Sequence, residues 1–298
     1  MSAYIIDGKK IAAEIKNSLI PQIERLKRTG CVPGLTVILV GENPASQIYI
    51  KMKTRACHEL GIISQTINLA RDTSQKKLLD VINKLNTDKN VHGILVQLPL
   101  PNHINEEEVI DSISPSKDVD GFHPVNRGNL ILGKDTFIPC TPFGIQKMLA
   151  GSNIDPDGKH VVIVGRSKIV GLPLATLLVQ KKSHANSTVT ICHTGTKHLS
   201  YFTRQAEILI AAIGQPEVIT GDMVKPGVVV IDVGVNRVED LTSEKGYRIV
   251  GDVEFKSVSE RARAISPVPG GVGPMTIAML IHNTVKAATQ FCASSSTG

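Results

Sequence analysis

The stretch Val161–Pro173, VVIVGRSKIVGLP, decides the fold of the second half of the chain. Its apolar beginning predicts a buried β-strand, residues 165–167 a tight turn, and residues 171–173 the start of a helix. These three parts together can hold a phosphate, because free backbone N–H groups and the helix dipole face the anion. Ser167 replaces the second glycine of the pattern GxGxxG, so an ordinary strand-to-helix turn is an alternative.

The next predicted strand, Thr188–Cys192, indicates which dinucleotide such a turn would bind. NAD enzymes usually end this strand with an acidic residue for the ribose 2′-hydroxyl, but here His193 and Thr194 follow. No carboxylate would repel a 2′-phosphate, and the Arg166 guanidinium could pair with it. These residues favour NADP over NAD, with a solvated surface arginine as the alternative for Arg166.

Strand-like and helix-like segments alternate on both sides of this stretch. Nearly all-apolar strands separated by helices imply parallel sheets covered on both faces, and therefore an α/β fold. Strands are expected at 35–40, 62–69, 91–96, 160–164, 188–192, 208–213 and 228–233. Helices are expected at 9–28 (interrupted at Pro21), 46–60, 75–86, 172–182, 200–206 and 275–287.

Residues 114–142, rich in Gly, Pro and Asn, interrupt this alternation. The 298 residues suffice for about two domains. We therefore expect a domain boundary close to residue 141.

Composition and charge exclude several classes of protein. Hydrophobic residues make up 42% of the chain and charged residues 20%, as in ordinary globular proteins. No apolar stretch approaches the roughly 20 residues of a membrane helix, and the charged N-terminus does not predict a secretory signal. The net charge of +6 fits nucleic acid or an anionic small molecule. Nucleic acid is disfavoured, because the few aromatic residues are scattered and no Lys/Arg run exceeds two residues.

The cysteines and histidines predict neither disulfides nor a metal site. The five cysteines are far apart, without a CxxC pair or zinc-ligand spacing, and the nine histidines form no HExxH motif. We expect reduced cysteines, a cytoplasmic protein and no bound metal. The cysteines are Cys31, Cys57, Cys140, Cys192 and Cys292.

Two motifs in the first half of the chain could carry chemistry. The spacing Tyr49-x-x-x-Lys53 places both side chains on one helical face, where Tyr49 could stack on a flat heterocycle. Lys53, if desolvated, could work as an acid or base, although a snorkelling surface lysine is the commoner case. Gln97 follows the strand at 91–96, and parallel sheets bind ligands at the carboxyl ends of their strands.

Two further motifs consist of turns and glycines. In the segment Lys117–Gly121, KDVDG, Asp120 could accept paired N–H donors, although most Asp-Gly pairs are only turns. The segment Pro269–Pro274, PGGVGP, predicts a rigid backbone that a ligand can approach closely, or a structural connection.

Taken together in their order and spacing along the chain, the five motifs closely resemble the bifunctional methylenetetrahydrofolate dehydrogenase/methenyltetrahydrofolate cyclohydrolase (FolD) family, from about Ile6 to Lys286. The resemblance implies two α/β domains with parallel sheets flanking a cleft, and a homodimer. It also implies a C-terminal helix that returns to the first domain. We therefore expect a folate-binding domain over 1–140, completed by the helix at 275–290, and a Rossmann-type NADP-binding domain over 141–274.

The resemblance also implies roles for individual residues. Lys53 corresponds to the catalytic lysine, Tyr49 to the folate-stacking tyrosine, and Gln97 to the partner of the lysine. Asp120 corresponds to the aspartate that holds the amino-pyrimidine part of the pterin. The implied catalytic residues are Lys53, Gln97, Tyr49 and Asp120. The implied substrate-binding residues are Tyr49, Lys53, Val96, Gln97, Leu98, Asp120, Pro269, Gly270, Gly273 and Pro274. The implied NADP contacts are Gly165, Arg166, Ser167, Thr194 and Val235.

The implied reactions act on tetrahydrofolate derivatives. NADP+ takes a hydride from 5,10-methylenetetrahydrofolate, and water then opens the methenyl product to 10-formyltetrahydrofolate. A short-chain NADP-dependent dehydrogenase of another small substrate is the alternative, because Ser46, Tyr49 and Lys53 mimic its catalytic pattern. The order of motifs argues against it, since that family has its glycine-rich turn before YxxxK and here Gly165 follows it.

Overall fold

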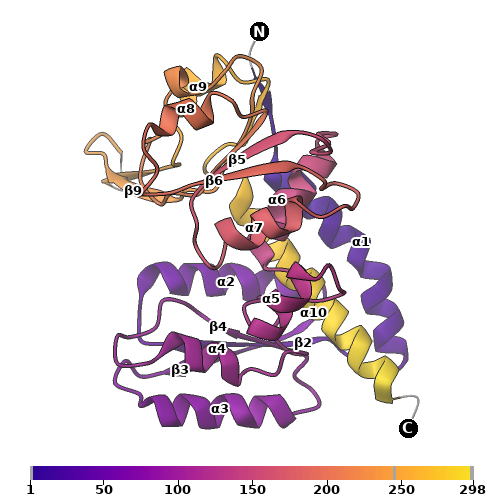
Figure 1. Cartoon of the computed structure of the whole chain (residues 1–298). Helices are drawn as coiled ribbons and strands as arrows, with labels where there is room; N and C mark the ends of the chain where they lie inside the picture. The colour runs from indigo at the N-terminus through magenta and orange to yellow at the C-terminus, as the bar shows by residue number, and fades with distance from the viewer. Residues whose placement is uncertain (1–2, 244–245, 296–298) are drawn as a thin grey trace. The chain divides into compact units, whose positions relative to one another are not determined.

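The computed structural model describes residues 3–243 and 246–295 (Figure 1). The chain forms two compact units. The six-stranded unit comprises the described residues up to Ala13 together with Thr141–Thr276, and the three-stranded unit comprises Glu14–Cys140 with the described residues from Ile277 onward. Helices α1 (Gly8–Arg28) and α10 (Val272–Ser295) each contribute residues to both units.

The six-stranded unit contains a wholly parallel sheet in the order β1-β11-β8-β7-β5-β6. Alternate residues such as Val162, Leu209 and Val230 pack in one core cluster with Val258 of helix α9 (Phe255–Ser259). Burial on both faces explains why the central strands β5, β7 and β8 are largely apolar. The strands are β1 (Tyr4–Ile5), β5 (His160–Val164), β6 (Thr188–Cys192), β7 (Ile208–Ala211), β8 (Val229–Asp232) and β11 (Ala264–Ile265).

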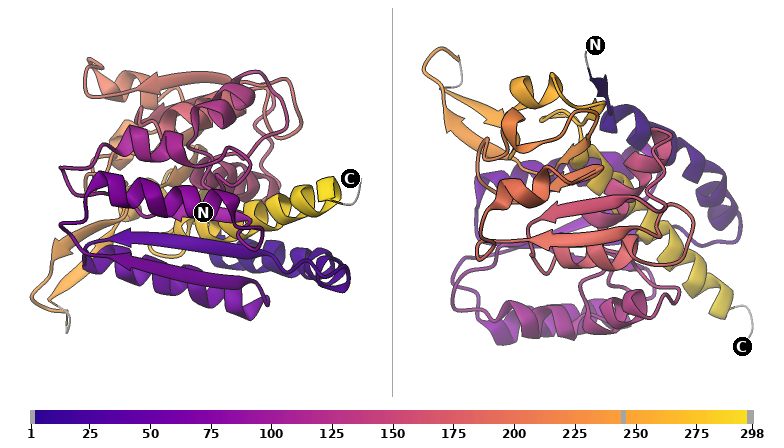
Figure 2. Two further views of the ribbon diagram at one scale, coloured as in Figure 1. Left: turned by 90° about the horizontal axis from the view of Figure 1, so that it is seen from below. Right: turned by 45° about the horizontal axis from the view of Figure 1, so that its top comes forward.

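Helices and one hairpin complete this unit. The antiparallel hairpin of β9 (Asn236–Glu239) and β10 (Tyr247–Val250) extends away from the six-stranded sheet (Figure 2). The helices are α6 (Cys140–Gly151), α7 (Gly171–Leu178), α8 (Leu199–Thr203), α9 (Phe255–Ser259) and a 3-10 turn at Gly221–Met223.

The three-stranded unit has β2 (Gly34–Val40) at the centre of a parallel sheet, between β3 (Ile63–Leu69) and β4 (Gly93–Val96). Helices α2 and α3 lie on opposite faces of this sheet (Figure 1). Ile38 and Ile94 pack against Leu78 and Ile82 of α3. The helices are α2 (Pro44–Glu59), α3 (Gln75–Thr87), α4 (Glu106–Ser112) and α5 (Pro124–Ile131), with parts of α1 and α10.

The parallel α/β fold predicted from the sequence is confirmed, but three details differ. Helix α1 runs uninterrupted through Pro21, because Pro21 and Asn17 are exposed, so water can bind the carbonyl that proline leaves without a donor. The Gly- and Pro-rich segment contains α5, where Pro124 occupies a first-turn position that suits it. Strand β1 pairs with β11, so the first residues belong to the six-stranded unit.

The prediction that all cysteines are reduced is wrong for one pair. Cys31 and Cys292 form a disulfide with their Cα atoms 6.7 Å apart, whereas Cys57, Cys140 and Cys192 are buried thiols. The partners are separated by 261 residues, and only the packing of α10 beside the start of β2 brings them together. Sequence spacing therefore carried no signal for this bond.

None of the described helices combines the length and apolar character needed to cross a membrane.

Candidate functional site

The carboxyl ends of four strands lie at one edge of the six-stranded sheet. Val164 pairs with Cys192 and Ala211, and Ala211 pairs with Asp232. The loops after β5, β6 and β8 therefore leave the sheet together. Strand order reverses direction at β5, which has β6 on one side and β7 on the other. Open α/β sheets bind ligands outside the carboxyl ends of their strands at such a reversal.

The expected NADP contacts all follow these strand ends. Gly165, Arg166 and Ser167 follow β5, Thr194 follows β6, and Val235 follows β8. The side chains of Arg166, Ser167 and Thr194 are exposed, and Val235 is 53% exposed. The structure thus brings these residues to one accessible edge of the sheet.

The glycine turn brings the chain unusually close to itself. Gly165 has φ +134°, and a Cβ there would lie 2.1 Å from the carbonyl oxygen of Ala212. A Cβ on Gly171 would lie 2.0 Å from the carbonyl oxygen of Gly165. The Ser167 hydroxyl accepts hydrogen bonds from the backbone N–H of Val170 (3.1 Å) and of Gly171 (3.4 Å), so it also orders the start of α7. The two glycines therefore allow a tight strand-to-helix turn, and such turns present free backbone N–H groups to an anion.

A lysine and a glutamine meet in the three-stranded unit. Lys53 Nζ donates a hydrogen bond of 3.1 Å to Gln97 Oε1. Gln97 Nε2 in turn donates to the carbonyl of Leu98 over 2.8 Å, which fixes the amide with its oxygen toward Lys53. Lys53 is 8% exposed, whereas Tyr49, one turn earlier on α2, is 38% exposed. The two side chains therefore offer a buried amine beside an accessible aromatic ring.

Strand β4 and the segment beside it determine where Gln97 and Asp120 lie. Buried Val96 ends β4, and the backbone N–H of Gln97 continues the ladder by donating to Ile38 over 2.9 Å. Ile94 also forms a parallel bridge with Asp118, which holds the segment containing Asp120 next to β4.

Of the two aspartates in the segment Lys117–Gly121, Asp118 accepts the N–H donors of the turn. The Asp118 carboxylate accepts from the backbone N–H groups of Phe122 (3.2 Å) and His123 (2.8 Å) and from Asn126 Nδ2 (2.8 Å). Asp118 therefore has the turn-forming role. The Asp120 carboxyl, in contrast, is available for other partners.

The surroundings of Asp120 make it a weaker acid than an ordinary aspartate, although it still ionises near neutral pH. Burial raises the pKa of Asp120 to about 6. The positive charge of Lys53 and a hydrogen bond from Cys140 work against this shift, whereas the negative charge of Asp118 adds to it. Because the charge of Lys53 contributes to the pKa of Asp120, the two side chains share one electrostatic environment. Lys53, Gln97, Tyr49 and Asp120 are thus brought together within the three-stranded unit.

Two buried thiols beside this group have no counterpart in the sequence predictions. Burial raises the pKa of Cys57 to about 11 and that of Cys140 well above its usual range, so both are neutral at neutral pH. The Sγ of Cys140 lies 3.4 Å from the carbonyl oxygen of Val119, the residue before Asp120. Isolated cysteines in the sequence give no sign of this position.

The glycine-rich loop Pro269–Pro274 belongs to the six-stranded unit, where it joins β11 to α10. Gly270 has φ +112°, and a Cβ on Gly8 would lie 1.9 Å from the carbonyl oxygen of Gly271. The loop therefore packs closely against the start of α1, while Gly273 has open space around its Cα. The structure does not group this loop in one unit with Lys53 and Gln97.

Lys51, two residues before Lys53, has different surroundings. It is exposed and lines a wide pocket of about 1780 Å³ together with Arg55 and His58 of α2. Neither Tyr49 nor Lys53 lines that pocket. Lys51 is therefore a matched control for substitutions of Lys53.

Comparison with known proteins identifies the family. Residues 6–120 match the catalytic domain of tetrahydrofolate dehydrogenase/cyclohydrolase, and residues 139–292 match the NAD(P)-binding domain of the same family. A bifunctional protein FolD of Pelodictyon phaeoclathratiforme is 56% identical over 286 residues, which are 95% of this chain and 97% of that protein.

Solved structures agree with this match. The bifunctional FolD of Campylobacter jejuni is 51% identical with a TM-score of 0.91, covering 97% of this chain and 99% of that one. The FolD enzyme of Trypanosoma brucei, complexed with NADP cofactor and inhibitor, is 37% identical with a TM-score of 0.91, covering 97% and 98%. The chain belongs to the tetrahydrofolate dehydrogenase/cyclohydrolase family.

Proposed function

We propose that the protein oxidises 5,10-methylenetetrahydrofolate to 5,10-methenyltetrahydrofolate with NADP+, and then hydrolyses this product to 10-formyltetrahydrofolate. The observation that carries the proposal is the hydrogen bond between Lys53 Nζ and Gln97 Oε1, beside Tyr49 and Asp120. It lies in a unit whose sequence matches the catalytic domain of the family, and the match of both domains disfavours a short-chain dehydrogenase.

The folate-binding residues offer complementary contacts. The accessible Tyr49 ring stacks on the flat pterin, and ionised Asp120 accepts two N–H donors of its amino-pyrimidine part. Leu98 provides apolar contact next to Gln97, whereas the Val96 side chain is buried in the core and leaves only its backbone for the substrate. Pro269, Gly270, Gly273 and Pro274 contribute backbone that substrate can approach closely. Holding the substrate in one orientation lowers the entropic part of the barrier to hydride transfer.

The residues at the edge of the six-stranded sheet fit a bound NADP. The turn at Gly165 and Gly171 would hold a phosphate, Arg166 would pair with the 2′-phosphate, and Thr194 and Val235 would provide a hydroxyl and a backbone contact. The loop His193–His198 carries Lys197 and no carboxylate, which agrees with a phosphorylated ribose. When bound, NADP supplies the nicotinamide ring that accepts the hydride.

The hydrolytic step depends on Lys53. Its amine takes a proton from water as the water oxygen bonds to the methenyl carbon. It then passes a proton to the ring nitrogen that leaves when the ring opens. Gln97 Oε1 holds Nζ in one direction, and the low exposure of Lys53 keeps bulk water from competing for it.

The organisation of the molecule completes the proposal. We assign the folate-binding domain to residues 1–140, completed by the helix at 275–290, and the NADP-binding domain to residues 141–274, except that the described residues up to Ala13 pack in the six-stranded unit. The protein acts as a homodimer in the cytoplasm. Light scattering of the purified protein tests the dimer, because a monomer mass at micromolar concentration contradicts it.

The activity assay supplies 5,10-methylenetetrahydrofolate with NADP+ or NAD+ and follows reduced cofactor and methenyl product. The proposal expects turnover with a clear preference for NADP+, and separate hydrolysis of added 5,10-methenyltetrahydrofolate. Failure of both reactions with folded protein would contradict it. Hydrolysis without oxidation would limit the function to a cyclohydrolase.

A further inference from the structure

A second pocket in the three-stranded unit surrounds the disulfide between Cys31 and Cys292. The pocket has a volume of about 590 Å³ and is formed by the end of α1, the segments before β2 and β4, and α10. Arg25 and Lys89 line it, and its described lining contains no Asp or Glu. None of the residues assigned to folate or NADP binding lines this pocket.

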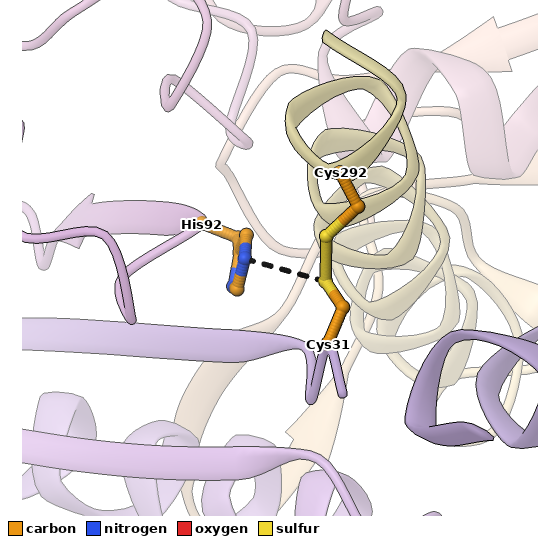
Figure 3. Close-up of side chains that lie close together, drawn as sticks. All are labelled: Cys31, His92 and Cys292. Carbon is orange, nitrogen blue, oxygen red and sulfur yellow. Dashed lines mark hydrogen bonds between the residues drawn. A yellow bond between two sulfur atoms is a disulfide. The ribbon is translucent and has the colours of Figure 1, made fainter. Parts of the chain in front are cut away.

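His92 lies beside the disulfide and directs one ring nitrogen at it (Figure 3). Its Nε2 is 3.7 Å from Cys31 Sγ. Its Nδ1 accepts a hydrogen bond of 3.1 Å from the backbone N–H of Gly34. A neutral imidazole that accepts at Nδ1 carries its proton on Nε2. The Nε2–H group of His92 is therefore a donor aimed at the sulfur of Cys31.

The surroundings of the ring keep it in this neutral form. Burial, together with the positive charge of Lys117, lowers the pKa of His92, and Asp88 opposes the shift only partly. Phe291 packs edge-on against the ring, with centroids 5.3 Å apart. The orientation of the donor is thus fixed from two sides.

The same three residues have the chemistry of metal ligands, with ligand atoms within 4.8 Å of one another. If a metal bound Nε2, the ring proton would have to move to Nδ1. The Nδ1–H group would then face the N–H of Gly34, so two donors would meet and the hydrogen bond would be lost. The hydrogen bond that orients the ring therefore favours a donor to sulfur over a metal ligand.

We propose that Cys31 and Cys292 form a reversible thiol–disulfide exchange site for anionic low-molecular-weight thiols, in which His92 stabilises the thiolate of Cys31. Arg25 and Lys89 attract the negative charge of the incoming molecule. A hydrogen-bond donor at sulfur stabilises a thiolate and makes it a better leaving group. Cys31 is consequently the sulfur that leaves, and Cys292 the sulfur that is attacked.

The exchange balances with two thiols. The first thiolate attacks Cys292 Sγ, the protein S–S bond breaks, and Cys31 leaves as a thiolate that accepts the Nε2–H of His92. A second thiolate attacks the small-molecule sulfur of the mixed disulfide, releasing Cys292 as a thiolate, which takes a proton from water. Two electrons pass from the two thiols to the protein, and one small-molecule disulfide forms.

One experiment measures reduction rates of the full-length protein with monothiols of different charge. Glutathione is the anionic probe, 2-mercaptoethanol the neutral one and cysteamine the cationic one. The reduction rate with each thiol is divided by its thiolate concentration before the three are compared. Alkylation and peptide mass spectrometry follow Cys31 and Cys292, with buried Cys57, Cys140 and Cys192 as internal controls. We expect glutathione to react several-fold faster than cysteamine at low salt, and Lys89→Gln or high salt to remove most of this difference. Equal rates, or no oxidation of the pair at any ratio of glutathione to its disulfide, would overturn the proposal.

A second experiment separates the two nitrogens of His92. His92→Asn keeps an acceptor for Gly34 but loses the donor at Nε2, whereas His92→Gln restores a donor there. In the reduced protein, the alkylation rate of Cys31 against pH gives its pKa. We expect this pKa to lie below that of an ordinary thiol in the wild type, to rise in His92→Asn and to return partly in His92→Gln. An ordinary Cys31 profile in the wild type would overturn the proposal. So would stoichiometric binding of Zn²⁺ by the reduced protein through the two cysteines and His92.

Discussion

Lys53 Nζ lies 3.1 Å from Gln97 Oε1, a hydrogen bond that joins helix α2 to the residue following β4. The partners come from segments on either side of β3, and 44 residues separate them along the chain. The second hydrogen bond, from Gln97 Nε2 to the carbonyl of Leu98, prevents the amide from turning its donor toward the lysine. The amine is therefore held in one direction by a neutral acceptor.

The first prediction concerns Gln97. Gln97→Leu removes the acceptor but keeps a side chain of similar size, so Lys53 loses its orientation. A hydrogen bond to a charged or catalytic group contributes about 1.5–3 kcal/mol, so we expect hydrolysis of 5,10-methenyltetrahydrofolate to slow by about 10- to 100-fold. Thermal unfolding of the variant serves as the control for folding. An unchanged hydrolysis rate would show that the hydrogen bond has no role in the reaction.

The second prediction concerns Asp120 and pH. Its pKa of about 6 in the folded protein lies above the usual 3.8, so the folded state binds more protons than the unfolded state between these values. Stability contributed by this carboxyl is therefore present at low pH and lost as pH rises through 6. Asp120→Asn, which imitates the neutral form, is expected to stabilise the protein by about 1–2 kcal/mol at pH 7.5 and by almost nothing at pH 4.

The measurement is the free energy of unfolding in urea at both pH values, combined with folate binding. We expect the more stable variant to bind tetrahydrofolate derivatives more weakly, because Asn offers one acceptor where the carboxylate offers two. The quantity to compare is the gain in unfolding free energy of Asp120→Asn over the wild type at each pH. A smaller gain at pH 7.5 than at pH 4 would refute the proposed cost of ionising Asp120.

The third prediction concerns the glycine turn after β5. Gly165→Ala brings a Cβ to 2.1 Å from the carbonyl oxygen of Ala212, so the turn must open. We expect NADP binding to weaken by at least 10-fold, as measured by fluorescence titration, with loss of stability of the six-stranded unit. Gly158→Ala is the control, since Gly158 also has positive φ but no atoms within 4 Å of the added Cβ. Equal effects of the two substitutions would mean that backbone strain alone, and not close approach, explains the result.

The fourth prediction concerns Arg166. Its exposed guanidinium follows the turn, where the proposed 2′-phosphate binds. Arg166→Gln is expected to raise KM for NADP+ by about 10- to 100-fold and to leave KM for NAD+ nearly unchanged, because NAD+ lacks that phosphate. Arg166→Lys should retain part of the preference. A parallel rise for both cofactors would show that Arg166 does not read the 2′-phosphate.

The fold could be predicted from the sequence where burial determines composition. The runs at 160–164 and 188–192 are strands at those residues; the first is almost wholly buried in the sheet, and the second, at the sheet edge, is only partly buried. Strands β1 and β11 could not be predicted, since two residues are too few for any periodicity. Their pairing depends on segments at opposite ends of the chain. Helix α5 could not be predicted, because it begins at Pro124 and proline is as typical of loops as of the first turn of a helix.

The candidate site was predictable in part. The motif Tyr49-x-x-x-Lys53 and Gln97 were recognisable, and the structure brings Lys53 into hydrogen-bond contact with Gln97. The distribution of hydrogen bonds between the two aspartates was not, because Asp118 rather than Asp120 accepts the donors of the turn. The disulfide of Cys31 was not predictable either, since it depends on tertiary packing across 261 residues.

The most direct test of the account compares Lys53→Met with Lys51→Met in the hydrolysis of 5,10-methenyltetrahydrofolate, measured by the loss of methenyl absorbance with correction for the uncatalysed rate. Both variants lose one amine from α2, but only Lys53 is buried and bonded to Gln97. We expect Lys53→Met to slow hydrolysis at least 100-fold, because general acid–base catalysis is lost, while Lys51→Met stays near the wild-type rate. Hydrolysis at the wild-type rate by a folded Lys53→Met protein would contradict it.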